Sequence, residues 1–224
     1  MDTHLDLDEL TRSTRRLEFE DGLVDLMNAS VFLVVTLLLA SIYSTSWMRL
    51  YFRLAVKHPN LMLVVLIALA PMMALLLIVS RQIIEHTRRN ILWKESGYVK
   101  PLRGYVDWRI NAFAALVLIF LTCMAAWGTM RGNFAPGTDL RTLAGGVGIA
   151  TGIIYFGIGK TLNLPRYSKV GFAGGLLSAA IPFLSISFSF SWTLLGSIWA
   201  VLLAISGVVG LRRARQASSE AADA

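Results

Sequence analysis

The sequence predicts an all-α integral membrane protein, a bundle of about six transmembrane helices with both termini in the cytoplasm. Three observations indicate this class: long apolar runs, a 55% hydrophobic composition with mean hydropathy +0.61, and basic residues concentrated in alternate connections. About 20 helical residues cross the hydrocarbon core of a bilayer. Because the apolar runs are continuous and do not alternate with polar residues, they favour helices over membrane β-strands.

Six apolar runs define the expected organisation of the 224 residues. The predicted spans are residues 24–45, 60–80, 110–130, 143–160, 169–187 and 191–210. They make up a transmembrane domain over 24–210, preceded by an amphipathic cytoplasmic segment over 1–23 and followed by a cytoplasmic tail over 211–224. Within this domain, residues 81–109 form the longest connection and are expected to face the cytoplasm.

The distribution of basic residues sets the predicted orientation. Of the 21 Lys and Arg residues, 16 fall on the side that holds both termini and the 81–109 loop. The other side carries Arg49, Arg53, Lys57, Arg131 and Arg141. Cytoplasmic loops are enriched in Lys and Arg, so the termini are expected inside. The net charge of +7 is explained by these flanks, and the sequence contains no nucleic-acid module, so nucleic acid is not an expected partner.

Asp, Glu, Lys, Arg and His are absent from the interior of each predicted span. Proton relays, ion-coupled carriers and intramembrane proteases need such groups at depth, so these chemistries are not expected, and neither a metal nor a cofactor is predicted. Asp21 and Asp25 lie one helical turn apart where the first span begins. They could capture a cation, or they could simply stabilise the start of the helix through its macrodipole.

Small residues spaced four apart predict close packing among the last three spans. The residues expected to carry this packing are Gly148, Gly152, Gly171, Gly175 and Gly196. This spacing puts each set on one helix face, where a neighbouring backbone can approach closely. Ile198 is expected on the opposite face from Gly196, in contact with lipid.

Two prolines and several neutral polar residues lie within the spans. Pro71 and Pro182 are expected to kink the second and fifth spans. If the six spans were two repeats of three, the second and fifth spans would occupy matching positions, and broken helices in matching positions are typical of transporters. The alternative is that the prolines have no such meaning, since proline is common in membrane helices generally. The neutral polar residues predict hydrogen bonds between helices or, alternatively, a site for a neutral or lipid-like ligand. They are Asn28, Thr36, Asn111, Thr122, Thr151, Tyr155 and Ser178.

Two boundary segments have the composition of membrane-surface elements. On the outer side, Trp47, Leu50, Tyr51 and Leu54 share one face of a predicted helix, and Arg49, Arg53 and Lys57 share another. In the cytoplasmic 81–109 loop, basic and aromatic residues are expected to contact anionic headgroups or a protein partner. These residues are Arg88, Arg89, Lys94 and Arg103, with Trp93 and Tyr98.

Two stretches resemble a known group of proteins: LTRSTRRLEFEDGL at 10–23 and WKESGYVKPLRG at 93–104. They are similar to functionally uncharacterised bacterial polytopic membrane proteins with a Thr-Arg-rich lead-in and a Thr-Gly-Tyr-Val loop, where this chain has Ser96 in place of the Thr. The resemblance covers less than half of the chain. It implies a location in the bacterial inner membrane and brings no activity or site with it.

Two classes of function fit these observations. The first is non-enzymatic: a transport component or a partner-binding membrane subunit, with membrane lipids, a protein partner or a second copy of the chain as its contacts. The alternative is a membrane-embedded enzyme that acts on a lipid at the cytoplasmic face, with Glu85, His86 and Arg88 as the available groups. The lack of paired acids and bases at depth favours the first class, and no catalytic residue is predicted for it.

Overall fold

Helices are the regular secondary structure of the described part of the protein. The structure is a computed structural model that describes residues 16, 19–57, 75, 78–80, 82–88, 108–132 and 138–222. Its helices are α2 (Leu23–Ile42), α3 (Thr45–Lys57), α5 (Trp108–Met130), α6 (Thr138–Thr161), α7 (Pro165–Ala179), the 3-10 helix η2 (Ile181–Phe183) and α8 (Phe188–Ala222). These described residues include no β-strand, so the prediction of an all-α fold is confirmed.

Four of the described helices are long and apolar enough to cross a membrane: α2, α5, α6 and α8. This is consistent with an integral membrane protein. These four helices cover the predicted first, third, fourth and sixth spans, and their ends differ by a few residues except at the end of α8, which continues to Ala222 where the predicted span ends at 210. The predicted second span, 60–80, and its Pro71 lie almost wholly outside the described residues.

The predicted fifth span differs from the observed helix in both position and length. Helix α7 begins at Pro165, whose missing N–H is tolerated in a first turn, and ends at Ala179 after 15 residues. That length corresponds to about 22 Å of rise, less than the roughly 30 Å of a hydrocarbon core. Pro182 follows in η2, because proline cannot donate the next helical hydrogen bond. The expected kink at Pro182 is therefore an end to the α-helix.

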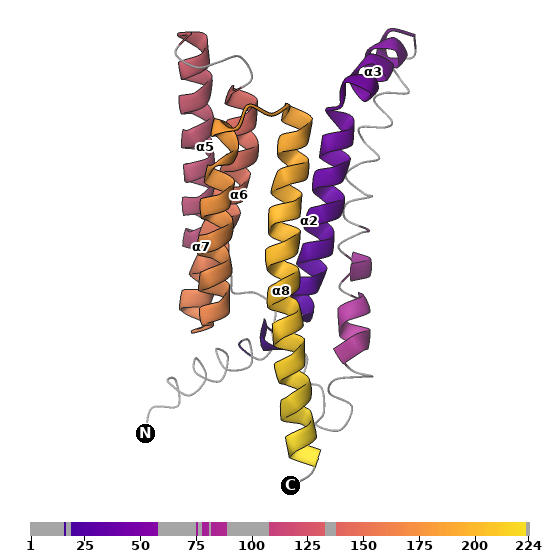
Figure 1. Ribbon diagram of the computed structural model, residues 1–224, viewed down its shortest axis with the longest axis vertical. Coiled ribbons are helices and arrows are strands. Elements are labelled where there is room, and N and C mark those ends of the chain that lie inside the picture. Colours follow the sequence, from indigo (N-terminus) through magenta and orange to yellow (C-terminus); the bar gives the residue numbers. More distant parts are fainter. Residues whose placement is uncertain are drawn as a thin grey trace.

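The helices form two neighbouring groups (Figure 1). Helix α2 packs along α8, and α6 packs between α5 and α7. The beginning of α2 lies beside the later part of α8, and its end lies beside the start of α8, so the two are antiparallel. The starts of α2, α5 and α7 and the end of α6 gather at one end of the bundle, and the last turns of α8 extend beyond it.

Glycines permit the closest approaches between these helices. A Cβ atom on Gly171 of α7 would lie 2.4 Å from the backbone nitrogen of Phe156 in α6, and one on Gly152 would lie 2.7 Å from the carbonyl oxygen of Gly171. On Gly148 it would meet Ser178, and on Gly196 it would meet Thr36 of α2. Gly175 is looser, with its nearest neighbour, Gly152 Cα, at 3.6 Å.

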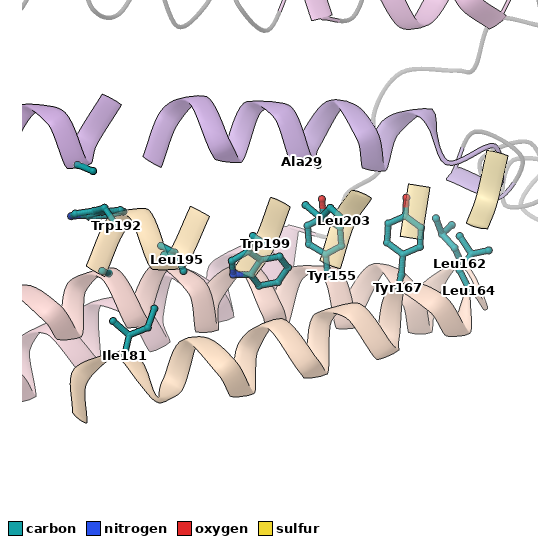
Figure 2. Close-up of a cluster of buried hydrophobic side chains, with 12 residues drawn as sticks. Ala29, Tyr155, Leu162, Leu164, Tyr167, Ile181, Trp192, Leu195, Trp199 and Leu203 are labelled. Atoms are coloured by element: carbon teal, nitrogen blue, oxygen red, sulfur yellow. The ribbon is translucent and has the colours of Figure 1, made fainter. Parts of the chain in front are cut away.

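An aromatic row fills the space between the two groups (Figure 2). Tyr155 stacks on Tyr167 with ring centroids 5.7 Å apart and lies 5.5 Å from Trp199, which in turn stacks on Phe32 of α2. Burying large aromatic rings contributes much of the packing energy of a core. The row therefore joins four helices around fully buried Trp199.

The prediction that Ile198 meets lipid stays a prediction. Ile198 is partly buried and packs against the core that contains Trp199. Helix α8 contacts α2 as well as α6 and α7. Its exposed stripe follows Val201 and Ile205, which are four residues apart.

Candidate functional site

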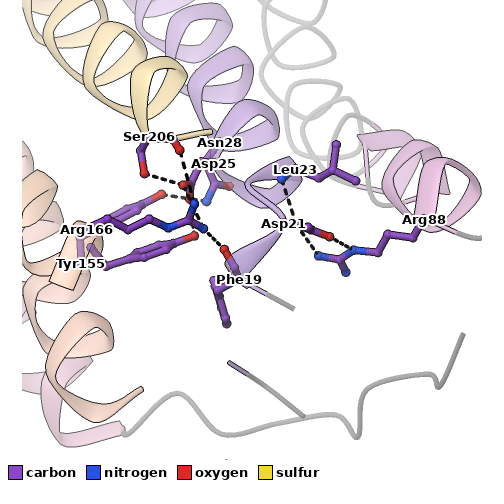
Figure 3. Close-up of polar contacts among 10 residues, drawn as sticks. Phe19, Asp21, Leu23, Asp25, Asn28, Arg88, Tyr155, Arg166 and Ser206 are labelled. Atoms are coloured by element: carbon purple, nitrogen blue, oxygen red, sulfur yellow. Dashed lines mark hydrogen bonds and ion pairs between the residues drawn. The ribbon is translucent and has the colours of Figure 1, made fainter. Parts of the chain in front are cut away.

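A fully buried carboxylate lies at the end of the bundle where α2, α7 and α8 meet (Figure 3). Asp25, in the first turn of α2, accepts hydrogen bonds from the Tyr167 hydroxyl and from Ser206 Oγ, the latter at 2.7 Å. Its Oδ2 also lies 3.7 Å from Nη2 of Arg166. One carboxylate thus links three helices through two hydrogen bonds and an ion pair.

Arg166 joins this carboxylate to the backbone around it. Its Nη2 donates to the carbonyl oxygen of Phe19, and its Nη1 donates to the carbonyl oxygen of Ser206 at 3.4 Å. The guanidinium also lies 5.2 Å from the centre of the Tyr167 ring. A guanidinium has five N–H donors in a planar fork, so it can serve a carboxylate and two carbonyls together.

Three glycines allow the polar groups to come together. Gly22, just before α2, has φ of 73°, a conformation that other residues rarely adopt. A Cβ atom there would lie 2.2 Å from the carbonyl oxygen of Gly207 in α8. A Cβ atom on Gly210 would lie 1.9 Å from Nη1 of Arg166. The close approach of α2 and α8 places Ser206 at Asp25, and Gly210 leaves room for Arg166, which comes from α7.

A second buried ion pair lies beside the first. Arg88 donates two hydrogen bonds to Asp21 from one edge of its guanidinium, with Nε 2.6 Å from Oδ2 and Nη2 3.2 Å from Oδ1. The exposed fractions of the two side chains are 4% and 2%. Asp21 Oδ1 also accepts a hydrogen bond from the backbone N–H of Leu23, at 3.0 Å. This bidentate pair connects the start of α2 to the segment 82–88.

The structure brings together some of the residues expected to contact lipid or a partner and does not describe the others. Arg88 lies against Asp21, and the contact that was expected of it with lipid or a partner stays a prediction. Glu85 is half-buried and His86 is exposed in the same segment. The remaining expected residues, Arg89, Trp93, Lys94, Tyr98 and Arg103, lie outside the described residues.

Six of the seven neutral polar residues, all but Asn111, divide into two kinds. Asn28 Nδ2 donates to the Tyr155 hydroxyl at 2.8 Å, and Trp199 Nε1 donates to Ser178 Oγ at 3.2 Å. The prediction of hydrogen bonds between helices is therefore confirmed for Asn28, Tyr155 and Ser178. Three threonines instead donate to a carbonyl of their own helix. These are Thr36, Thr122 and Thr151.

The chemistry of this charge cluster, defined as Asp21, Asp25, Arg88 and Arg166, is that of paired charges. Each carboxylate has a guanidinium within ion-pair distance, so the cation that the two acids could have captured is supplied by the chain itself. Removing one partner of such a pair leaves an uncompensated buried charge, which is strongly destabilising. The described residues contain no group of three or more His, Cys, Asp and Glu side chains suited to a metal ion.

Sequence reasoning identified Asp21 and Asp25 but missed Arg166, Tyr167 and Ser206. A usable indication was present, because Arg166 begins a helix on the same predicted side as the two acids. Buried acids at a membrane boundary need a partner. The basic residues that start or end neighbouring spans are the natural candidates.

Comparisons with known proteins do not extend this description. No protein-family model matches the chain, and no curated protein and no solved structure matches it significantly. The resemblance of the lead-in and of the 93–104 loop to bacterial membrane proteins therefore stays a prediction.

Proposed function

We propose that this chain is a non-enzymatic polytopic membrane protein that acts as a transport component or a partner-binding membrane subunit. The observation that carries the proposal is the pairing inside the charge cluster. Asp25 is fully buried and is engaged by Tyr167, Ser206 and Arg166. A carboxylate held in this way stabilises the junction of three helices and does not face a substrate.

The proposed setting is the bacterial inner membrane, with about six spans and both termini in the cytoplasm. The grouping of basic residues supports this orientation. Lys160 lies in the last turn of α6, and Arg166 and Lys169 lie near the start of α7. All three are on the side of the bundle beyond which α8 extends. Arg131 and Arg141 flank the opposite ends of α5 and α6. Under the positive-inside rule, the end with the charge cluster is cytoplasmic.

Lipid headgroups and a protein or second copy of the chain are the proposed partners on that side. Helix α8 has 35 residues, about 52 Å of rise, so it is longer than a hydrocarbon core requires. Arg212, Arg213 and Arg215 are exposed on its extension. Clusters of basic residues beside a span attract anionic lipids, and the same charges suit an acidic protein surface.

The test is purification of the full chain from native membranes in mild detergent, with mass spectrometry of the retained proteins and lipids. We expect a partner in fixed ratio, or uptake of a solute when the chain is reconstituted into vesicles. In parallel, the purified chain is incubated with total membrane lipid and the lipid products are followed over time. Conversion that is lost in both Glu85→Gln and His86→Gln would overturn the proposal in favour of a lipid-modifying enzyme. The absence of both partner and uptake would also contradict it.

A further inference from the structure

Helix α3 leaves the end of α2 that lies opposite the charge cluster (Figure 1). The chain turns at Tyr43 and Ser44, so α3 does not continue the axis of α2. Among the described elements, α3 has its main contact with α2 alone. A helix of 13 residues is marginal in water without tertiary support, and the described elements give α3 little of that support.

The two faces of α3 differ in chemistry. At about 100° per residue, Arg49, Arg53 and Lys57 form a narrow stripe, with Ser46 between them. Polar residues cover roughly a third of the circumference, and apolar residues cover the rest. Tyr51 lies near the centre of the apolar face, and Trp47 lies on the same face.

Several large side chains of the apolar face are exposed. Trp47 is 55% exposed, Phe52 is 60% exposed and Val56 is 84% exposed. The basic side chains on the opposite stripe are exposed as well. A helix that exposes a broad apolar face and a cationic stripe has the chemistry of one lying in a membrane interface.

We propose that α3 lies in the outer interface of the membrane, with Trp47 and Tyr51 among the acyl chains and the basic stripe on the phosphates of anionic lipids. This surface is separate from the cytoplasmic function proposed above. Long Arg and Lys side chains can cover apolar surface while their charged ends reach the headgroups. Three cations on one stripe complement an anionic lipid surface.

A second element at the same end has the same chemistry. Helix α5 ends at Met130, and Arg131 lies 4.3 Å from the centre of the Trp127 ring. Trp127 is 56% exposed. Tryptophan concentrates where hydrocarbon meets headgroups, and a neighbouring cation can reach the phosphates from there. Trp127 and Trp47 thus mark one interface from two different helices.

The position of α3 is tested by spin labels in the full chain carrying Cys123→Ser. Labels are attached at Trp47→Cys and Tyr51→Cys on the apolar face and at Ser46→Cys on the polar stripe. In reconstituted vesicles, oxygen should enhance the relaxation of the labels at Trp47→Cys and Tyr51→Cys preferentially. A water-soluble nickel chelate should enhance the relaxation of the label at Ser46→Cys. Equal access of the chelate to all three labels would overturn the proposal. Protection of Tyr51→Cys from both reagents in native membranes, with access to the chelate in vesicles, would overturn it in favour of a protein partner.

The role of charge is tested with Arg49→Gln, Arg53→Gln and Lys57→Gln combined. Binding of phosphatidylglycerol to the protein is measured in vesicles in which a quarter of the lipid is phosphatidylglycerol and the rest is phosphatidylcholine. Vesicles of phosphatidylcholine alone give the background. Each charge near an anionic surface strengthens binding about fivefold, so the triple variant should lose well over tenfold. Arg131→Gln, at the same end but outside α3, is the matched control and should lose about fivefold at most. Equal losses in the two variants would contradict a role for the stripe.

Discussion

Ser206 Oγ donates a hydrogen bond of 2.7 Å to Oδ2 of Asp25, joining residues 181 positions apart in the chain. The same carboxylate oxygen lies 3.7 Å from Nη2 of Arg166. The oxygen therefore holds α8 and α7 to the first turn of α2. A buried charge that three helices share should report on their association more directly than any single apolar contact does.

Asp25→Ala should destabilise the protein strongly. It leaves the guanidinium of Arg166, 16% exposed, without its carboxylate, and breaking a buried pair by removing one partner costs about 3–5 kcal/mol. Ser206→Ala removes one hydrogen bond to a charged group and should cost about 1.5–3 kcal/mol. Thermal unfolding in a single detergent would measure both variants.

The double variant Asp25→Ala with Arg166→Met is the control for this pair. It removes the orphaned charge, and replacing both partners of a buried pair with apolar groups is often neutral. The double variant should therefore melt above Asp25→Ala alone. If the losses of stability in Asp25→Ala and in Arg166→Met simply add in the double variant, the ion pair is not what stabilises this junction.

Gly171→Ala and Gly175→Ala form a matched pair on one helix, four residues apart. A Cβ at Gly171 would lie 2.4 Å from the Phe156 backbone nitrogen, which cannot move aside without shifting α6. A Cβ at Gly175 would lie at an ordinary contact distance of 3.6 Å. Overpacking costs about 1–3 kcal/mol, so Gly171→Ala should lower the melting temperature clearly while Gly175→Ala stays near the unchanged chain. Similar melting of the two would refute the close approach of α6 and α7.

The long apolar helices could be predicted because their composition alone specifies them. The runs that became α2, α5, α6 and α8 have no ionisable interior, and lipid leaves such a run few alternatives to a helix. The end of α7 was harder to place. Pro182 was identified, but a kink and a helix end begin with the same missing hydrogen bond, and only packing around η2 decides between them.

The charge cluster could be predicted only in part because it is made by tertiary contact. Asp21 and Asp25 stand out at the start of an apolar run, whereas Arg166 looks like an ordinary flanking base. Arg166 comes from α7, and it reaches Asp25 where α2 and α8 approach closely at Gly22 and Gly207 and where Gly210 leaves room for its guanidinium. Glycine carries no charge pattern, so nothing in the local sequence connects these positions.

Reporter fusions would test the proposed orientation. A reporter after Ala224 and one inserted at 94–100 should both be cytoplasmic, and one inserted at 133–138, between α5 and α6, should be outside. The physical reason is the charge asymmetry of the flanks, which leaves five basic residues on the outer side, Arg131 and Arg141 among them. A cytoplasmic reporter at 133–138 would rule out the six-span arrangement.

Arg88 and the rest of the basic loop should separate into two roles. Arg88→Ala leaves the carboxylate of Asp21, which is only 2% exposed, buried without a counter-charge. It should therefore lower the stability of the fold by about 3 kcal/mol or more.

Lys94→Gln with Arg103→Gln should leave stability unchanged and reduce retained anionic lipid or partner, since each charge near such a surface contributes about 1 kcal/mol. Both quantities are measured on correctly inserted protein, by melting and by mass spectrometry of bound lipid. Unchanged retention in the double variant would leave orientation in the membrane as the role of Lys94 and Arg103, and unchanged melting of Arg88→Ala would mean that its pair with Asp21 does not stabilise the fold.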